Sequence, residues 1–255
     1  MKIFPLLAMA LSALSILSSC SRETSNKTVP DSTHADARPT APSHPRYTTI
    51  KVDSRTERIE LFLRDDSGRV FNRFDTLNAW LATRNRRLRF AMNAGMFEAD
   101  FSPVGLLVQD GREISPLNLR DASGNFYLKP NGVFLISGSG PRIVESSEYP
   151  ALARGVRLAT QSGPLLLRNG AIHPAFNAAS KSRLLRNGVG VAGDTVIFVI
   201  SEQPVNFHEL ATFFRDELHC PDALYLDGTV SSLYSEELKR NDYRTELGPI
   251  IGVVR

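Results

Sequence analysis

Short apolar stretches separated by turn residues run through the chain from residue 47 to residue 255. Their length and alternation are typical of strands. Asp-Gly at 110–111 and Asn-Gly at 169–170 stand between consecutive stretches and favour tight hairpins. We expect a turn to join the first two strands. The pattern predicts strands at 48–53, 58–64, 88–92, 105–108, 112–114, 157–161, 165–168, 171–172, 189–191, 195–200, 223–226 and 250–254, with further strands inside 125–137.

Two segments show helical spacing instead. One helix should be capped by Asp75, and its apolar face consists of Leu77, Trp80 and Leu81. The other is predicted at 206–219, where Asn206 and Glu209 have the spacing of a capping box and Pro221 stops the helix. Many hairpins with few helices predict an α+β domain built mainly on antiparallel sheet.

The N-terminus has a different pattern. Lys2 precedes an apolar stretch at 3–17, which is too short to cross a bilayer core of roughly 30 Å as a helix. Residues 1–19 therefore read as a signal peptide. Leu17-Ser18-Ser19-Cys20 resembles a bacterial lipobox, which predicts a lipid on Cys20. The alternative is an ordinary signal peptide with a chance cysteine.

Residues 20–46, beginning with the lipidated Cys20, are rich in Ser, Thr, Pro and Asn. Such a segment has little to bury and should be a disordered linker. Residues 47–255 have the length of a single domain. These features predict a protein of the cell envelope, anchored to a membrane by its lipid. Ser21 after the cysteine favours the periplasmic face of the outer membrane in a Gram-negative cell.

Composition narrows the function classes. The net charge is +3, and the basic residues are spread along the chain, so we expect no nucleic-acid partner. The one basic run, at 84–89, is more simply a polar helix end. With Cys20 lipidated, Cys220 stands alone, so no disulfide can form within the monomer. It is better read as a small buried hydrophobe than as a nucleophile.

Motifs for metal, serine-hydrolase or nucleotide chemistry do not occur. The histidines at 173, 208 and 219 lack the spacing of a zinc site. The serines near 162 and 231 do not lie in a G-x-S-x-G motif, and no phosphate-binding P-loop is present. The sequence requires no cofactor, and it leaves dependence on a divalent ion and the oligomeric state open.

Several strands end in a polar residue next to a glycine, which can let a ligand approach the backbone or can serve an ordinary turn. One such place alone indicates only a turn. Together, these donors and amides suit hydroxyl-rich or anionic ligands such as sugars and phosphates. The groups are Asn93 with Gly95, Lys129 and Asn131 with Gly132, Gln161 and Ser162 with Gly163, Asn187 with Gly188, and Asp227 with Gly228, Ser231 and Ser232.

These places belong to longer motifs, in this order: Asn93-Ala94-Gly95-Met96-Phe97, Phe126-Tyr127-Leu128-Lys129-Pro130-Asn131-Gly132-Val133-Phe134, Ala159-Thr160-Gln161-Ser162-Gly163-Pro164-Leu165, Arg186-Asn187-Gly188-Val189-Gly190, Leu226-Asp227-Gly228-Thr229-Val230-Ser231-Ser232-Leu233-Tyr234 and Gly248-Pro249-Ile250-Ile251-Gly252-Val253. The set resembles the phosphodiester glycosidase family, which includes the enzyme that uncovers mannose 6-phosphate. Better-known members run a glycine-rich stretch after the aspartate, where this chain has Gly228-Thr229-Val230. The likeness is therefore to a bacterial lipoprotein branch, and it does not give the sugar or its partner alcohol.

The resemblance implies hydrolysis of a sugar 1-phosphodiester at the glycosidic carbon. Asp227 is then the carboxylate at the reacting carbon, as nucleophile or as general base, although a turn aspartate is the simpler alternative. Arg186 suits a bidentate phosphate contact, and Lys129 a second one unless it is only a surface lysine. Candidates for a second carboxylate are Glu98, Asp100 and Glu202.

The sequence thus favours a lipid-anchored hydrolase of envelope or extracellular phosphoglycans, with a carbohydrate phosphodiester as substrate. A second hypothesis is a non-catalytic module of the same fold that binds glycan or an anionic polymer. Retention or inversion depends on a carboxylate separation that the sequence does not give.

Overall fold

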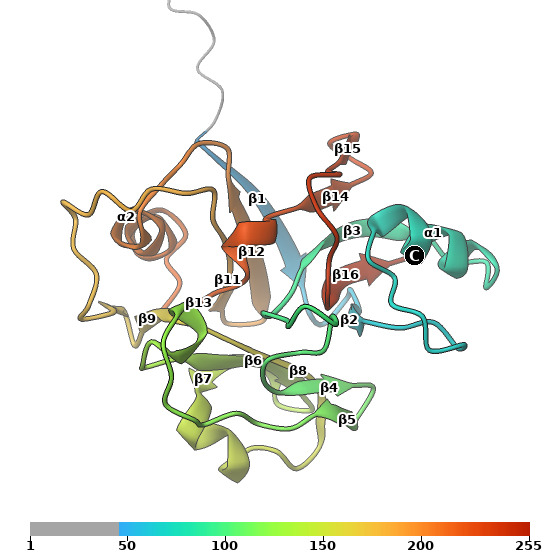
Figure 1. Ribbon diagram of the computed structural model, residues 1–255, viewed down its shortest axis with the longest axis horizontal. Helices are drawn as coiled ribbons and strands as arrows, with labels where there is room; N and C mark the ends of the chain where they lie inside the picture. The colour runs from blue at the N-terminus through green and yellow to red at the C-terminus, as the bar shows by residue number, and fades with distance from the viewer. Residues whose placement is uncertain (1–45) are drawn as a thin grey trace, which may run out of the picture. The chain divides into compact units, whose positions relative to one another are not determined.

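The computed structural model describes residues 46–255 (Figure 1). The predicted signal peptide, Cys20 and the linker up to residue 45 lie outside the described residues. Three sheets, with antiparallel pairing throughout, make up most of the described chain and belong to one compact unit. The mainly antiparallel α+β class predicted from the strand and turn pattern is confirmed.

The first sheet has six strands in the order β1-β12-β11-β13-β9-β10. These strands are β1 (Tyr47–Asp53), β9 (Leu165–Arg168), β10 (Ala171–Ile172), β11 (Asn187–Ala192), β12 (Thr195–Ser201) and β13 (Asp222–Tyr225). The first sheet therefore combines the start of the domain with its C-terminal half.

The other two sheets have five strands each. The second sheet, ordered β15-β14-β3-β16-β2, consists of β2 (Ile59–Phe62), β3 (Leu88–Asn93), β14 (Leu233–Ser235), β15 (Arg240–Asn241) and β16 (Ile250–Val254). The third sheet, ordered β5-β4-β8-β6-β7, consists of β4 (Leu107–Gln109), β5 (Arg112–Ser115), β6 (Gly132–Ser137), β7 (Gly140–Glu145) and β8 (Val156–Ser162).

One apolar core lies where the three sheets meet. Phe198 of the first sheet has its ring centroid 4.9 Å from that of Phe90 in the second sheet and 6.5 Å from that of Phe134 in the third. Each of these side chains is at most 1% exposed, and burial of one stabilises the fold by roughly 1.5–3 kcal/mol. The shared core holds the sheet ends, and the side chains on them, in fixed relative positions.

The first and second sheets are buried on both faces. In β12, Val196, Phe198 and Ile200 join the shared core, whereas Ile197 and Val199 pack toward α2 (Phe207–Thr212). This alternation explains why β12 reads as an unbroken apolar run. In the same way α1 (Phe74–Ala82) covers the outer face of the second sheet.

Helix boundaries differ from the sequence predictions. The capping box of Asn206 and Glu209 is confirmed, but α2 ends at Thr212 and a π-helical turn, Phe213–Glu217, follows it. Asp75 lies inside the first turn of α1, and Arg73 holds the N-cap position without a side-chain hydrogen bond. The predicted cap at Asp75 is therefore wrong; its carboxylate accepts a hydrogen bond from Asn241 instead.

Some strand predictions also need correction. The hairpins at Asp110 and Asn169 are confirmed, and both residues have positive φ angles. A turn joins the first two strands, as expected, but they do not pair with each other, because β1 pairs with β12 and β2 with β16. Residues Asn125–Tyr127 form a 3-10 helix rather than a strand. The sequence patterns missed β7, β14 and β15. Among residues 46–255, no helix combines the length and apolarity needed to cross a bilayer.

Candidate functional site

Asn93, the last residue of β3, links three parts of the chain. Its Nδ2 donates a hydrogen bond to the Asp227 carbonyl oxygen (2.8 Å). Its Oδ1 accepts from Asn187 Nδ2 (2.8 Å) and from the Ser232 N–H (3.0 Å). Asn93, Asn187 and Ser232 are each at most 1% exposed. The structure thus brings together four of the candidate residues, and one buried amide ties the first sheet to the second at this point.

Asp227 follows β13 and begins a short 3-10 turn, Gly228–Val230. Its Oδ1 accepts a hydrogen bond from the Thr229 N–H (3.2 Å), and Ser231 Oγ closes the turn by donating to the Gly228 carbonyl (2.8 Å). The residue is half-buried. Burial raises the pKa of the Asp227 carboxyl, and the Thr229 N–H lowers it, with burial the larger effect. A half-buried carboxyl with a raised pKa is typical of acid–base catalysts.

The segment after Asn93 reaches the third sheet. The Ala94 carbonyl accepts from the Asp227 N–H at 3.4 Å, and the Gly95 N–H donates to Thr160 Oγ1 at 3.2 Å. A Cβ atom on Gly95 would lie 2.6 Å from Thr160 Oγ1 and closer still to the Gln161 carbonyl. The glycine is therefore required for close contact with β8, a role within the protein rather than one toward a ligand.

Gln161 does not face a ligand. Its side chain is buried, and its Oε1 accepts from the backbone N–H groups of Leu106 (3.0 Å) and Asn118 (2.9 Å). Its Nε2 donates to the Asn118 carbonyl (2.7 Å) and to Ser146 Oγ (3.1 Å). Because all four hydrogen-bonding positions of the amide are filled, the expected substrate contact of the Gln161 side chain is not supported.

Two further candidates, Lys129 and Asn131, hold the loop before β6 in place. Asn131 is buried, and its Nδ2 donates to the Phe126 carbonyl (2.7 Å). Lys129 pairs with Asp121 and donates to the Leu119 carbonyl (3.3 Å), with 44% of its side chain exposed. Both residues thus fasten the chain around the 3-10 helix at 125–127. The surface-lysine alternative describes Lys129 better than the expected phosphate contact does.

The candidates for a second carboxylate lie in turns or in structural pairs. Glu98 is exposed in a tight turn, where its N–H donates to the Ser102 carbonyl (2.8 Å). Asp100 accepts from the Ser102 N–H in that turn. Glu202 accepts from Thr48 Oγ1 (2.6 Å) and pairs with Arg240. Asp100 and Glu202 therefore have structural partners, whereas the Glu98 carboxylate has none within residues 46–255.

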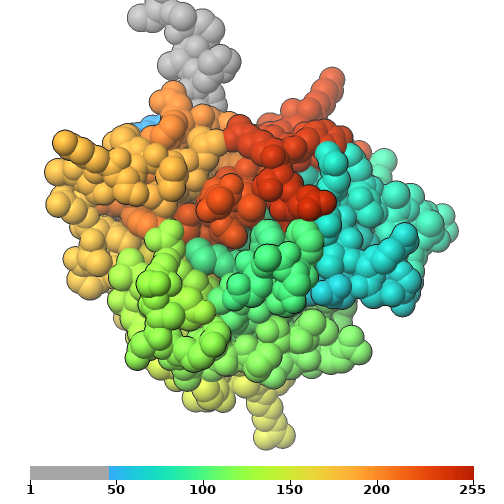
Figure 2. Space-filling model, viewed as in Figure 1, coloured from blue at the N-terminus to red at the C-terminus, as the bar shows by residue number. Residues whose placement is uncertain are grey.

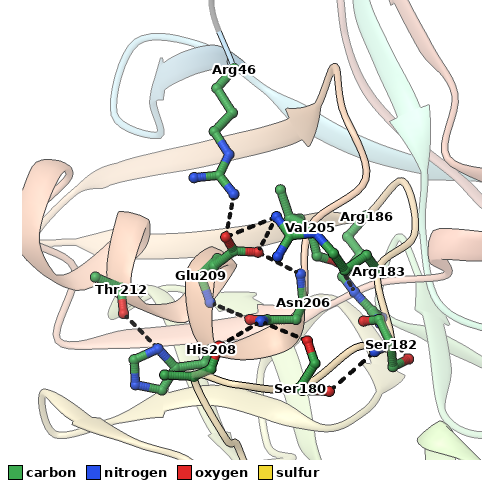
Figure 3. A network of polar contacts seen from close by, with 11 residues as sticks. Arg46, Ser180, Ser182, Arg183, Arg186, Val205, Asn206, His208, Glu209 and Thr212 are labelled. Atoms are coloured by element: carbon green, nitrogen blue, oxygen red, sulfur yellow. Dashed lines mark hydrogen bonds and ion pairs between the residues drawn. The ribbon is translucent and has the colours of Figure 1, made fainter. Parts of the chain in front are cut away.

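Arg186, just before β11, is 1% exposed. Its Nε donates to the Val205 carbonyl (2.9 Å), and its Nη2 donates to the Ser182 carbonyl (3.2 Å) (Figure 3). The guanidinium carbon lies 3.7 Å from the ring centroid of Phe207. A side chain this deeply enclosed cannot form the expected bidentate phosphate contact. The structure corrects that expectation and places Arg186 behind the site.

Tyr225 connects Arg186 with the Asp227 turn, and no sequence pattern had marked it as part of the site. Its hydroxyl oxygen accepts a hydrogen bond from the Gly228 N–H at 3.0 Å. Burial raises the pKa of the Tyr225 hydroxyl, the Arg186 charge lowers it and the Asp227 charge raises it. Tyr225 therefore lies within the fields of both charged groups. The hydroxyl of a tyrosine in a buried strand needs a hydrogen-bond partner. This need is the one signal in the sequence that could have pointed to Tyr225.

The Asp227 turn lies on the face of the molecule shown in Figures 1 and 2, where the orange-red segment after β13 adjoins the green segment that follows β3. A groove of about 610 Å³ lies elsewhere, lined by residues that include Asp65, Trp80, Asp110 and Arg112. Within residues 46–255, no group of three His, Cys, Asp or Glu side chains is arranged to hold a metal ion. The polar groups that converge are therefore Asn93, Asn187, Asp227 and Ser232. Tyr225 contacts the Asp227 turn, and Arg186 faces the Tyr225 ring.

Comparisons with known proteins agree with this arrangement at the level of fold. The catalytic domain of zebrafish N-acetylglucosamine-1-phosphodiester alpha-N-acetylglucosaminidase, auto-inhibited by its pro-peptide, superposes with a TM-score of 0.55 at 14% identity, over 84% of this chain and 85% of that chain. A hypothetical protein from Synechocystis gives a TM-score of 0.55 at 15% identity, over 82% and 59% of the two chains.

Sequence comparisons carry the family assignment. The uncharacterized protein YigE of Escherichia coli strain K12 is 34% identical over 186 residues, which is 72% of this chain and 72% of that protein. The profile of the phosphodiester glycosidase family matches residues 86–254, which include β3, Arg186 and the Asp227 turn. The chain therefore belongs to the phosphodiester glycosidase family.

Proposed function

We propose that this protein hydrolyses the glycosidic bond of sugar 1-phosphodiesters, with Asp227 as the carboxylate at the reacting carbon. The observation that carries the proposal is the placement of Asp227: half-buried, with a raised pKa, on a turn held by Asn93. Family membership supports the reaction class. The zebrafish relative is named as a phosphodiester glucosaminidase, which supports a sugar phosphodiester as substrate here.

The chemistry suits a site with one dominant carboxylate. The bond between the glycosidic carbon and the phosphate oxygen breaks, and the phosphate leaves with the electron pair. A phosphate with a second pKa near 6 leaves without a strong general acid, so the site needs mainly charge stabilisation at the sugar carbon. Water supplies the new hydroxyl of the sugar, and its second proton goes to solvent. Asp227 serves as base or nucleophile, and both roles require its ionised form.

The buried charge of Arg186 favours an anionic ligand. Within the described residues its guanidinium has no carboxylate partner, so its positive charge is not neutralised locally. A field of this kind attracts a phosphodiester without direct contact. The open carboxylate of Glu98 is the remaining candidate for a second acid–base group.

The test uses the full-length chain in detergent with a panel of nucleotide sugars and sugar 1-phosphodiesters, with and without a chelator. We expect release of free sugar from at least one substrate and a loss of at least about 100-fold in Asp227→Asn. Asp216→Asn is the control, because Asp216 is an exposed aspartate paired with Arg215. Tight binding without turnover at any pH would instead support the non-catalytic binding module.

The proposed setting is the cell envelope, at the periplasmic face of the outer membrane in a Gram-negative cell. The lipobox at Cys20 and the polar segment that follows it support this placement. One acyl chain binds membranes only marginally, so durable anchoring needs several chains on the cysteine. Incorporation of labelled palmitate, lost in Cys20→Ala, is the expected result. Equal labelling of the parent protein and of Cys20→Ala would exclude Cys20 as the lipid site.

A further inference from the structure

We propose that Tyr225 is a positioning residue for Asp227, and that the buried Arg186 fixes the Tyr225 hydroxyl for this task. The proposal rests on the proposed function of Asp227 and adds two groups that do not touch the substrate. It assigns a role to a tyrosine in an apolar strand and to an arginine that the solvent does not reach.

The first observation is the contact between Tyr225 and the turn that carries Asp227. The Gly228 N–H donates to the Tyr225 hydroxyl at 3.0 Å, one residue after the carboxylate. A Cβ atom on Gly228 would lie 2.8 Å from Tyr225 Cζ and nearer still to the hydroxyl, so only glycine permits this approach. Among the hydrogen bonds of the described residues, this contact fastens the start of the turn to the first sheet.

The second observation is the enclosure of Arg186. The guanidinium lies over the Phe207 ring at 3.7 Å and faces the Tyr225 ring at 5.6 Å, and the two rings meet edge to face at 4.7 Å. Nη1 is buried without a hydrogen-bond partner in residues 46–255. Burial lowers the pKa of Arg186, and the Tyr225 hydroxyl raises it.

A buried guanidinium without a carboxylate partner is unfavourable, and Arg186 has none within residues 46–255, so its presence here calls for a function. Its field acts on the phenol oxygen that receives the Gly228 N–H. The charge limits reorientation of the hydroxyl, because the cation repels the hydroxyl hydrogen and disfavours orientations in which it points toward the guanidinium. The phenol oxygen thus stays available as the acceptor for Gly228, and the Asp227 carboxylate keeps its place.

Positioning of this kind affects turnover more than binding. A displacement of about 1 Å in a catalytic group can lower the rate by about 100-fold. In Tyr225→Phe the ring remains, but the acceptor for Gly228 is lost. We expect kcat to fall by about 10- to 100-fold while KM changes by less than about threefold. The control is Tyr149→Phe, which removes a hydroxyl from a buried tyrosine in a different apolar cluster and should leave kcat unchanged.

A second measurement does not depend on turnover. Hydrogen exchange of peptides covering residues 226–232, in the full-length chain, should be faster in Tyr225→Phe than in the parent and in Tyr149→Phe. If the parent hydrolyses no substrate, the proposed function fails, yet this measurement still decides whether Tyr225 holds the turn. Parental exchange in Tyr225→Phe, or a parental kcat, overturns the proposal.

A double-mutant cycle tests the role of Arg186. Arg186→Lys keeps a charge but loses the planar group that stacks on Phe207. If Arg186 acts through the Tyr225 hydroxyl, the two substitutions should be non-additive in kcat, with the double variant about as slow as the slower single variant. Additive losses would remove Arg186 from the proposal.

Discussion

The side chains of Asn93 and Asn187, 94 positions apart in sequence, are joined by a hydrogen bond of 2.8 Å between Asn187 Nδ2 and Asn93 Oδ1. Asn93 ends a strand of the second sheet and Asn187 begins a strand of the first. The Nδ2 of Asn93 in turn holds the carbonyl of Asp227. The candidate carboxylate is thus located by an amide pair that also connects two sheets.

Replacement of Asn93 by alanine should weaken both stability and activity. The change leaves three polar groups without their partner: the buried Asn187 Nδ2 and Ser232 N–H, and the partly buried Asp227 carbonyl. Each such group costs about 1–3 kcal/mol, partly recovered by water, so we expect the free energy of unfolding to fall by about 3 kcal/mol. Urea denaturation of the full-length chain measures it.

A suitable control is Asn177→Ala, because Asn177 is exposed and its side chain accepts only the Ala179 N–H in the described chain. That variant should lose at most about 1 kcal/mol. Equal stability of Asn93→Ala and the parent would mean that the amide pair does not hold the sheets together.

Gly95→Ala tests the close approach of two sheets. The added Cβ would meet Thr160 Oγ1 at 2.6 Å and would press on the Gln161 carbonyl, a backbone atom that cannot rotate away. We expect a loss of about 2–3 kcal/mol in the free energy of unfolding, as in other overpacked cores. Thermal and urea unfolding of the variant measure the loss.

The matched control is Gly138→Ala, a glycine whose added Cβ would meet nothing within 4 Å. The two substitutions add the same atom, and the control should change stability by less than about 1 kcal/mol in either direction. Similar effects at both positions would contradict the packing role given to Gly95.

The sequence predicted most elements of the fold because local signals determine them. Asp110 and Asn169 adopt positive φ at the tips of the predicted hairpins, and Asn206 with Glu209 forms the predicted capping box. Pairing between distant strands carries no local signal. The residues of β1 have the pattern of an ordinary strand, and they do not indicate that β1 pairs with β12.

The site was predictable only in outline, for a related reason. A polar residue beside a glycine at a strand end marks a place where chains meet, but not the direction of the side chain. Asn187 and Gln161 are both polar residues close to a glycine at one end of a strand, yet Asn187 faces Asn93 while Gln161 binds the backbone of the third sheet. Tyr225 lies in a buried strand that resembles core, and Arg186 was expected to face a ligand. Only their contacts show that Arg186 faces the Tyr225 ring and that Tyr225 binds the Asp227 turn.

Glu209 should contribute to resistance against acid. Burial raises the pKa of its carboxyl, but the Asn206 N–H together with Arg46 and Arg183 lowers it to about 2 (Figure 3). The contribution is present above the ordinary value of 4.5 and is lost as pH falls toward 2. Because solvent partly screens the ion pairs of Glu209 with Arg46 and Arg183, we expect Glu209→Gln to lower the free energy of unfolding by about 1 kcal/mol at pH 7. This corresponds to about 2–4 °C in Tm.

The difference in Tm between Glu209→Gln and the parent should shrink as the pH approaches 2. Glu113→Gln serves as the control, since Glu113 is exposed on β5, and its Tm should follow the parent at every pH. A deficit of Glu209→Gln that stays constant down to pH 2 would show that charge is not the cause.

Asp227 should have the opposite pH dependence, because its pKa is raised by burial. Between the ordinary value of 3.8 and the raised value, the folded protein binds more protons than the unfolded chain, so stability falls as pH rises through this window. In its ionised form, which the proposed catalytic role requires, the half-buried carboxylate is a cost to the fold. Asp227→Asn removes this cost, so its Tm at pH 7 should exceed that of the parent while its activity is lost. The excess should disappear below pH 3.8, where both side chains are neutral.

An aspartate that served only to cap its turn would give the reverse, a lower Tm for Asp227→Asn at pH 7, since an amide accepts the Thr229 N–H less strongly than a carboxylate. The sign of this Tm difference therefore shows whether burial of the charge or the turn hydrogen bond dominates the energetics of the Asp227 carboxylate.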